Sequence, residues 1–242
     1  MIEAENLAKH FRAPHRGVVR AVEDVSFRCQ PGQVYGLLGA NGAGKTTTLR
    51  MLATLLSPSA GSARVAGHDV RHDSPAVRSN IGFLSAATAL YGRLTALEMT
   101  EYFGRLHGIE GETLRRRVRD VFARLEIDFA DRRCDTLSTG MKQKVSIART
   151  LVHDPPVMIF DEPTLGLDVM TARAIVGFIR ECRAQGKTVL FSTHVMSEAE
   201  KLCDVIGIIH QGRLLAEGTL ADLRNRYQQQ DLEEIFVRAV ES

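Results

Sequence analysis

The 242-residue sequence lacks several features that define special classes of protein. Its four cysteines are widely spaced and none belongs to a C-x-x-C motif, so the sequence indicates neither a zinc site nor a redox pair. No apolar run approaches the length of a membrane-spanning helix, about 18 residues. The first ten residues contain two glutamates and no apolar run, unlike a secretion signal. We therefore expect a cytoplasmic protein.

The sequence also lacks a large excess of one charge. The net charge is +2, so bulk electrostatics give no reason to expect a nucleic-acid partner. Apolar residues make up 44% and charged residues 25%, which is ordinary for a globular chain of one large domain or two small lobes. Four arginines cluster within 115–119, but nearby acidic residues favour a solvated helix face there.

A glycine-rich stretch at 39–46 matches the pattern G-x-x-x-x-G-K-[ST]. The apolar segment 34–38 predicts a buried strand before it, and leucines at helical spacing predict a helix over 46–56. Glycines let backbone N–H groups surround an anion, and a helix N-terminus adds partial positive charge. Lys45 would reach the β- and γ-phosphates, and the Thr46 hydroxyl would bind Mg²⁺. A glycine-rich loop that matched the pattern by accident would have no reason to lie between a predicted strand and a predicted helix.

Two adjacent carboxylates follow the continuous apolar run 157–160, which predicts a strand buried on both faces. Side chains alternate along a strand, so Asp161 and Glu162 are expected to point different ways. Asp161 could hold Mg²⁺ directly or through water, and Glu162 could take the proton from an attacking water. The alternative is a pair of acids solvated in a loop.

A helix predicted from 137 to about 151 places Ser138 at its N-cap. This is the second helix N-terminus in the chain that is suited to hold an anion. One nucleotide cannot easily use both ends within a single compact subunit. Either two copies of the chain form a composite site, or Ser138 simply caps its own helix.

Two other side chains are candidates for nucleotide contacts. His194 follows the strand predicted at 188–192, and ligands of open α/β sheets gather at such strand ends. It could donate a hydrogen bond to the γ-phosphate and the attacking water, or it could be structural. Phe11 could stack on a nucleotide base, or it could be an ordinary core or surface side chain. His68 and His72 are four residues apart, but no third metal ligand is in view.

The composition changes to helix formers over 95–127, which indicates a helical lobe inserted into an α/β domain. Two β-like patches at 2–7 and 18–27 precede the glycine-rich stretch. A closing hairpin is expected at 205–216 and a last amphipathic helix at 232–240.

Together these motifs resemble the ATP-binding-cassette (ABC) ATPases over nearly the whole chain. The stretch 39–46 looks like their Walker A motif, and 158–163 looks like their Walker B motif. The segment 137–141, Leu-Ser-Thr-Gly-Met, resembles their signature loop and begins 24 residues before Asp161. Asp168 matches the D-loop, His194 the switch histidine and Phe11 the base-stacking position. The signature is the specific part, because Walker motifs alone would fit many P-loop enzymes.

The resemblance implies a fold and a division of the chain. The fold is α/β, a P-loop NTPase with a RecA-like, mostly parallel sheet core, an antiparallel β-subdomain and an inserted α-helical subdomain. A single ABC ATPase domain would cover 1–242. Its catalytic core would comprise 1–85 and 153–226, its helical subdomain 86–152, and its C-terminal tail helix 227–242.

The resemblance also implies a head-to-tail homodimer that forms on ATP binding. Two ATP molecules would each lie between Lys45 of one subunit and Ser138, Thr139 and Gly140 of the other. Mg²⁺ would be held by Thr46 and Asp161, while Glu162 and His194 would be catalytic. The residues implied to bind ATP within one subunit are Phe11, Gly39, Ala40, Asn41, Gly42, Ala43, Gly44, Lys45, Thr46 and Thr47.

Two positions depart from the family pattern. Thr139 stands in the signature where the family usually has glycine, and a small side chain is expected to fit. Ala86 stands where the family carries a glutamine that helps to hold Mg²⁺ and links the nucleotide to the helical lobe. That contact must be missing or replaced, with Ser85 or Thr88 as candidates.

The segment 162–173, with the altered glutamine position, looks most like bacterial ABC-2-type export ATPases, nearest to the sodium-export (Nat) group. The resemblance implies an ATPase subunit that drives efflux, of sodium or a drug, through a separate permease chain. Such a subunit would be peripheral on the inner face of the plasma membrane. The alternative is a soluble ABC-type ATPase in assembly, repair or translation. A P-loop kinase is disfavoured, because it would leave the signature and His194 without a role.

Overall fold

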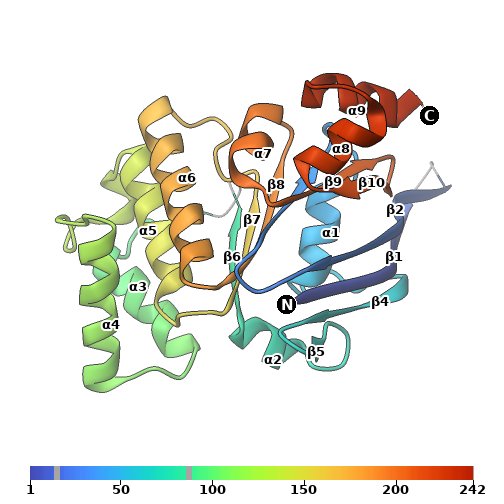
Figure 1. Cartoon of the computed structure of the whole chain (residues 1–242). Helices are drawn as coiled ribbons and strands as arrows, with labels where there is room; N and C mark the ends of the chain where they lie inside the picture. Colours follow the sequence, from blue (N-terminus) through green and yellow to red (C-terminus); the bar gives the residue numbers. More distant parts are fainter. Residues whose placement is uncertain (14–16, 86–88, 242) are drawn as a thin grey trace.

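The computed structural model describes residues 1–13, 17–85 and 89–241, which form a mixed ten-stranded sheet with helices packed around it (Figure 1). The strand order is β5-β4-β1-β2-β10-β9-β3-β8-β7-β6. The strands are β1 (Ile2–Ala13), β2 (Gly17–Cys29), β3 (Val34–Leu38), β4 (Ala60–Val65), β5 (His68–Asp69), β6 (Ile81–Ser85), β7 (Val157–Asp161), β8 (Thr188–Thr193), β9 (Val205–His210) and β10 (Arg213–Gly218).

Parallel strands form the part of the sheet that carries the glycine-rich loop. β3 pairs in parallel with β8 and β9, and β7 pairs in parallel with β6 and β8. Alternate residues of β7 enter two separate cores, one with Met158 and Phe160 and the other with Val157 and Ile159. The apolar run 157–160 is therefore buried on both faces, as the sequence predicts.

Antiparallel strands form the other part, in which β1 pairs with β2 and β4. β6 and β7 are neighbours in the sheet, although the described residues between them, 89–156, contain three α-helices. The expected helical insertion into an α/β domain is therefore confirmed. The helices are α1 (Lys45–Leu52), α2 (Ser74–Ser79), α3 (Ala96–Leu106), α4 (Gly111–Arg124), α5 (Thr139–Leu151), α6 (Val169–Ala184), α7 (Met196–Leu202), α8 (Leu220–Tyr227) and α9 (Leu232–Glu241), with a 3₁₀ turn at Cys134–Thr136.

Some boundaries differ from the sequence predictions for local reasons. α1 ends at Leu52 rather than at 56, because Thr54 adopts a left-handed conformation and the Leu55 N–H bonds back to the Arg50 carbonyl. This closing geometry is a common helix C-cap. The short helix α7 was not expected at all. Within the described ranges, no helix is both long and apolar enough to cross a membrane.

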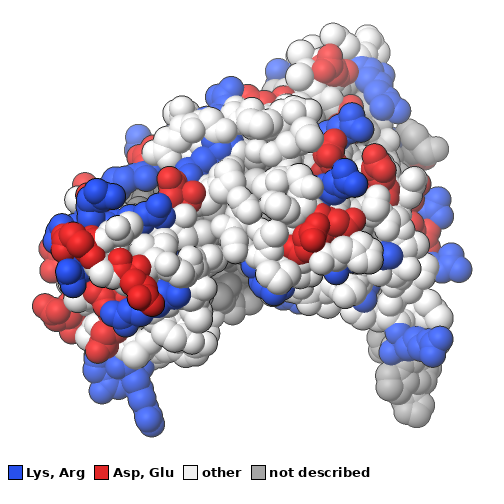
Figure 2. Space-filling model, turned by 90° about the horizontal axis from the view of Figure 1, so that it is seen from below, with Lys and Arg blue, Asp and Glu red and all other residues white. Residues whose placement is uncertain are grey.

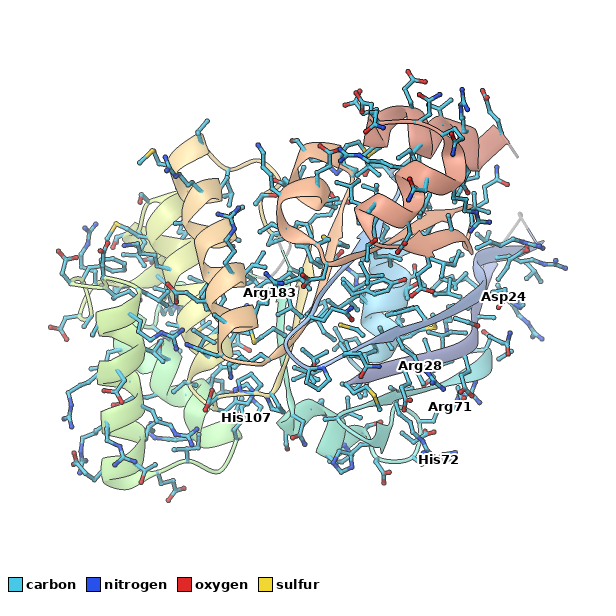
Figure 3. The ribbon with its side chains drawn as sticks, viewed as in Figure 1. Asp24, Arg28, Arg71, His72, His107 and Arg183 are labelled. Atoms are coloured by element: carbon cyan, nitrogen blue, oxygen red, sulfur yellow. The ribbon has the colours of Figure 1, made fainter. Side chains whose placement is uncertain are left out.

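The arginine cluster lies on α4 at the outside of the helical lobe. Glu112 accepts from Arg115 at 2.9 Å and from Arg119 at 3.0 Å. Acidic and basic side chains interleave over the lobe at the left of Figure 2, which agrees with a solvated helix face. Figure 3 places His72 beside β5, far from His107 of the lobe, and the described residues contain no group of three or more His, Cys, Asp or Glu arranged to hold a metal.

Candidate functional site

The glycine-rich loop joins the carboxyl end of β3 to the start of α1. Gly42 and Gly44 have φ angles of 83° and 109°, in the left-handed region that disfavours other residues. A side chain at Gly44 would also meet the Ala21 carbonyl oxygen at 2.7 Å, and one at Gly39 would overlap the Ile209 carbonyl. Glycine is therefore required here both for conformation and for close packing.

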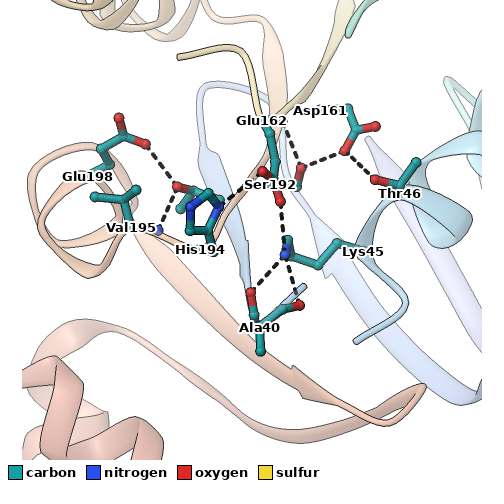
Figure 4. Close-up of polar contacts among 11 residues, drawn as sticks. Ala40, Lys45, Thr46, Asp161, Glu162, Ser192, His194, Val195 and Glu198 are labelled. Atoms are coloured by element: carbon teal, nitrogen blue, oxygen red, sulfur yellow. Dashed lines mark hydrogen bonds and ion pairs between the residues drawn. The ribbon is translucent and has the colours of Figure 1, made fainter. Parts of the chain in front are cut away.

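Lys45 points back over this loop rather than into solvent. Its side chain is 4% exposed, and Nζ donates to the carbonyl oxygens of Gly39 at 2.7 Å and Ala40 at 3.1 Å. Nζ also lies 3.0 Å from Glu162 Oε1 (Figure 4). A buried ammonium needs such partners, because burial without them is costly. An incoming phosphate would compete with Glu162 for this cation.

Asp161 ends β7 and is 4% exposed. Its Oδ1 accepts two hydroxyl hydrogen bonds, from Thr46 Oγ1 at 3.0 Å and from Ser192 Oγ at 2.9 Å. The structure therefore brings the hydroxyl at the start of α1 into contact with the carboxylate that ends β7. A hydroxyl and a carboxylate are oxygen ligands of the kind that Mg²⁺ takes, together with waters and substrate phosphates.

Glu162 occupies a left-handed turn, with φ of 46°, directly after β7. Its N–H donates to Ser192 Oγ at 3.0 Å and to the Ser192 carbonyl at 3.2 Å. Its carboxylate lies between two nitrogen groups, with Oε1 on Lys45 Nζ and Oε2 3.0 Å from His194 Nδ1. The expectation that Asp161 and Glu162 point different ways is met, because each carboxylate contacts a different set of side chains.

His194 follows β8, and its neighbours in the chain are fixed by hydrogen bonds. Thr193 Oγ1 donates to Glu198 Oε2 at 2.8 Å and accepts from the Val195 N–H at 3.0 Å. Sequence reasoning missed Ser192, Thr193 and Glu198. A signal was present, since two hydroxyl residues end a buried strand immediately before His194, and an acid follows in the first turn of α7.

A cavity of about 290 Å³ opens beside these groups. Phe11 is not among the described residues that line this cavity, although it lies on the same β1–β2 hairpin as Ala21. The Phe11 side chain is 37% exposed, and Lys9 Nζ lies 5.2 Å from the centroid of its ring. The position of Ala86 lies outside the described residues, whereas Ser85 pairs with Asp161 across the sheet. The residues that line the cavity are Ala21, Asn41, Gly42, Gly44, Lys45, Thr46, Thr47 and Glu162.

The signature residues lie on a different part of the subunit. Ser138 is the N-cap of α5, where its hydroxyl accepts from the Met141 N–H at 3.3 Å, so the predicted cap is confirmed. Asp168 caps α6 and accepts from the Thr171 hydroxyl at 2.7 Å and from backbone N–H groups, which lowers the pKa of its carboxyl. Thr171 Oγ1 would lie 3.1 Å from a Cβ at Gly140, so these two helix starts are adjacent.

Comparison with known proteins relates this arrangement to a family. A family model described as ABC transporter matches residues 22–165. The ABC transporter ATP-binding protein NatA of Bacillus subtilis (strain 168) is 42% identical over 98% of this chain and 97% of its own length. The Nod factor export ATP-binding protein I of Paraburkholderia xenovorans (strain LB400) is 43% identical over 84% of this chain and 67% of its own.

Two solved structures share the fold. The ATP-binding subunit of an ABC transporter superposes with a TM-score of 0.88 at 30% identity, over 99% of both chains. An ATP-binding cassette in a dimeric, post-hydrolysis state with ADP and Pi superposes with a TM-score of 0.81 at 27% identity, over 90% of this chain and 98% of that one. Family model, relatives and structures agree, and the chain therefore belongs to the ABC transporter family as one of its ATP-binding proteins.

Proposed function

We propose that this protein is the ATP-hydrolysing subunit of a bacterial exporter and acts on a separate membrane permease. One observation carries the proposal: Lys45, Thr46, Asp161, Glu162 and His194 converge from three parallel strands beside one cavity. Ligands of parallel α/β sheets bind at this end of the strands. Export is supported by the similarity to a Nod factor export ATP-binding protein, and the 42% identity to NatA favours the Nat group.

The phosphate loop binds ATP with its backbone. Residues 39–47 provide N–H groups and the positive end of α1 for the phosphates, and Lys45 exchanges Glu162 for a phosphate oxygen. Once Lys45 contacts the phosphate, the Glu162 carboxylate is free to accept a proton from the attacking water. Phe11 supplies an aromatic face to the base once the nucleotide is in place.

Mg²⁺ fits the donor set, since Thr46 Oγ1 and Asp161 Oδ1 already lie 3.0 Å apart at the cavity edge. Bound there, Mg²⁺ would neutralise charge on the phosphates. Glu162 accepts a proton from the attacking water, and His194 orients Glu162 through the 3.0 Å contact and donates toward the γ-phosphate.

A second copy of the chain completes the site. Ser138, Thr139 and Gly140 are not among the described residues that line the cavity, and we assign them to the nucleotide of another subunit. The dimeric ADP-and-Pi cassette supports dimerisation, and we assign the two copies a head-to-tail arrangement. Asp168, on the adjacent helix start, belongs to the same subunit boundary.

The helical subdomain, assigned to 86–152, transmits the nucleotide state to the permease. A second cavity, of about 510 Å³, lies between this lobe and the core, with Phe83 and Leu55 on one side and Phe103 and Leu106 on the other. An apolar cleft of this kind suits a helix from the permease. The core is assigned to 1–85 and 153–226, the tail to 227–242, and the subunit to the inner face of the plasma membrane.

The test replaces the base. Glu162→Gln should still bind ATP and should trap the dimer, while turnover falls by about 10²–10⁴-fold, the usual contribution of a general base. Steady-state hydrolysis and size-exclusion chromatography with ATP measure both effects, and Glu234→Gln on the exposed face of α9 is the matched control. Parental turnover in Glu162→Gln would refute the assignment of the base.

Transport is tested by co-expression with the membrane protein encoded beside this gene. The protein should co-purify from membranes with that partner, and the partner should stimulate its ATPase activity. A chain that stays soluble and unpartnered would favour the non-transport alternative.

A further inference from the structure

Ser192 has no role in the mechanism so far, although it contacts both acidic residues at the end of β7. It is the penultimate residue of β8, is 0% exposed, and stands opposite Asp161 in the parallel register of β7 and β8. Most buried serines need only one partner to satisfy the hydroxyl. Ser192 Oγ has two partners, and both belong to the carboxyl end of β7.

The two hydrogen bonds form a directed chain. The Glu162 N–H donates to Ser192 Oγ at 3.0 Å, and Ser192 Oγ donates to Asp161 Oδ1 at 2.9 Å (Figure 4). A hydroxyl has one hydrogen, so accepting from an N–H leaves that hydrogen for the carboxylate. The two hydrogen bonds of the Ser192 hydroxyl therefore constrain each other. The Glu162 N–H also donates to the Ser192 carbonyl at 3.2 Å.

The first bond supports a backbone conformation that Glu162 would otherwise avoid. A glutamate with φ of 46° persists only when its surroundings hold it there. This turn aims the carboxylate at Lys45 and His194. Among the described residues, loss of the serine hydroxyl leaves the Glu162 N–H with the longer bond to the Ser192 carbonyl, at 3.2 Å.

The second bond acts on the oxygen that Thr46 also touches. Asp161 Oδ1 receives both hydroxyls, so rotation of the carboxylate would break two hydrogen bonds at once. Mutation of a residue that hydrogen-bonds to a metal-binding carboxylate commonly lowers metal affinity or activity by about 10–100-fold.

We propose that Ser192 is a positioning residue that orients Asp161 for Mg²⁺ and Glu162 for proton transfer through one hydroxyl. The proposal rests on the proposed function of these two carboxylates. It predicts that removing the hydroxyl weakens two properties together, the dependence of ATP binding on Mg²⁺ and the turnover number.

The test compares Ser192→Ala with Thr188→Val, which removes another buried hydroxyl from the same strand, where it contacts the chain's N-terminus. ATP binding is measured by calorimetry in the Glu162→Gln background, with excess Mg²⁺ and with EDTA. The ratio of ATP affinities with and without Mg²⁺ should be about 10-fold smaller in Ser192→Ala than in the parent of that background. In the chain that keeps Glu162, Ser192→Ala should lower kcat by about 10–100-fold. Binding in EDTA should not change, and Ser192→Thr should restore kcat.

The proposal is overturned if Ser192→Ala keeps the parental Mg²⁺ effect and kcat. It is equally overturned if affinity falls as much in EDTA, if Thr188→Val shows the same losses, or if a folded Ser192→Thr variant restores nothing. An unmodified chain that does not hydrolyse ATP would instead refute the proposed function. The calorimetric comparison would still decide the role of Ser192 toward Asp161.

Discussion

A stacked histidine pair predicts how the stability of this protein depends on pH. The rings of His107 and His153 lie 3.6 Å apart at an angle of 2°, and both side chains line the 510 Å³ cavity. His153 Nε2 lies 3.0 Å from the Ile81 carbonyl, which can only accept, so Nε2 carries the hydrogen. Nδ1 is buried without a partner in the described structure. Burial, and then the neighbouring His107, lowers the pKa of His153 to about 4.

The sign of the effect follows from the direction of this shift. The folded state holds a proton on His153 only below about pH 4, whereas the unfolded chain binds one below 6.5. The contribution of His153 to stability is therefore complete above 6.5 and is lost as the pH falls toward 4. At 1.36 kcal/mol per pKa unit the total is about 3 kcal/mol, of which about 2 kcal/mol is lost between about pH 7.5 and pH 5.

The perturbation is His153→Gln, because the amide can still donate to the Ile81 carbonyl and does not titrate. Urea unfolding followed by circular dichroism at about pH 7.5 and pH 5 gives the free energies. The parent should lose about 2 kcal/mol more than the variant, or about 4–8 °C in Tm for a chain of this size. His72→Gln, at an exposed position, should behave as the parent. Equal losses in the parent and His153→Gln would refute the reasoning.

Two shorter predictions concern a cap and a close contact. Ser138→Ala should lower the free energy of unfolding by about 1 kcal/mol, because α5 loses its N-cap. Ser138→Asp should keep the cap and the stability but abolish the ATP-dependent dimer in size-exclusion chromatography. A Ser138→Asp variant that still dimerises with ATP as the parent does would contradict the composite site. Gly36→Ala should lower the free energy of unfolding by about 1–3 kcal/mol, because the new Cβ would overlap Cys203 Sγ. Adding Cys203→Ala should recover part of this loss. If the effects of the two substitutions simply add in thermal unfolding, the contact is contradicted.

The motifs that the sequence predicts correctly are those set by local chemistry. The turn from β3 to α1 needs glycines at positive φ, and the cap of α5 needs a hydroxyl within three residues of its N–H partner. The two-sided burial of 157–160 follows from an unbroken apolar run. Each of these depends on residues close together in the chain, and so it can be inferred without knowing the fold.

The sequence is least informative where boundaries and partners depend on distant contacts. α1 was expected to extend to 56, but the left-handed Thr54 ends it earlier. The stacking of Phe11 on a nucleotide base stays a prediction, whereas the sequence did not indicate that Ala21, of the same hairpin, lines the 290 Å³ cavity. The register between β1 and β2, which includes irregular steps, decides this and has no signal in the local pattern.

By itself the sequence determined that a phosphate loop, a pair of carboxylates and a capped helix are present in one α/β chain. Only the tertiary structure decided that Glu162 meets both Lys45 and His194, and that Ser192 joins Glu162 to Asp161. The physical reason is the strand order: β3, β8 and β7 are adjacent in the sheet although they are far apart in the chain. Their carboxyl ends therefore bring to one place side chains that no local spacing relates.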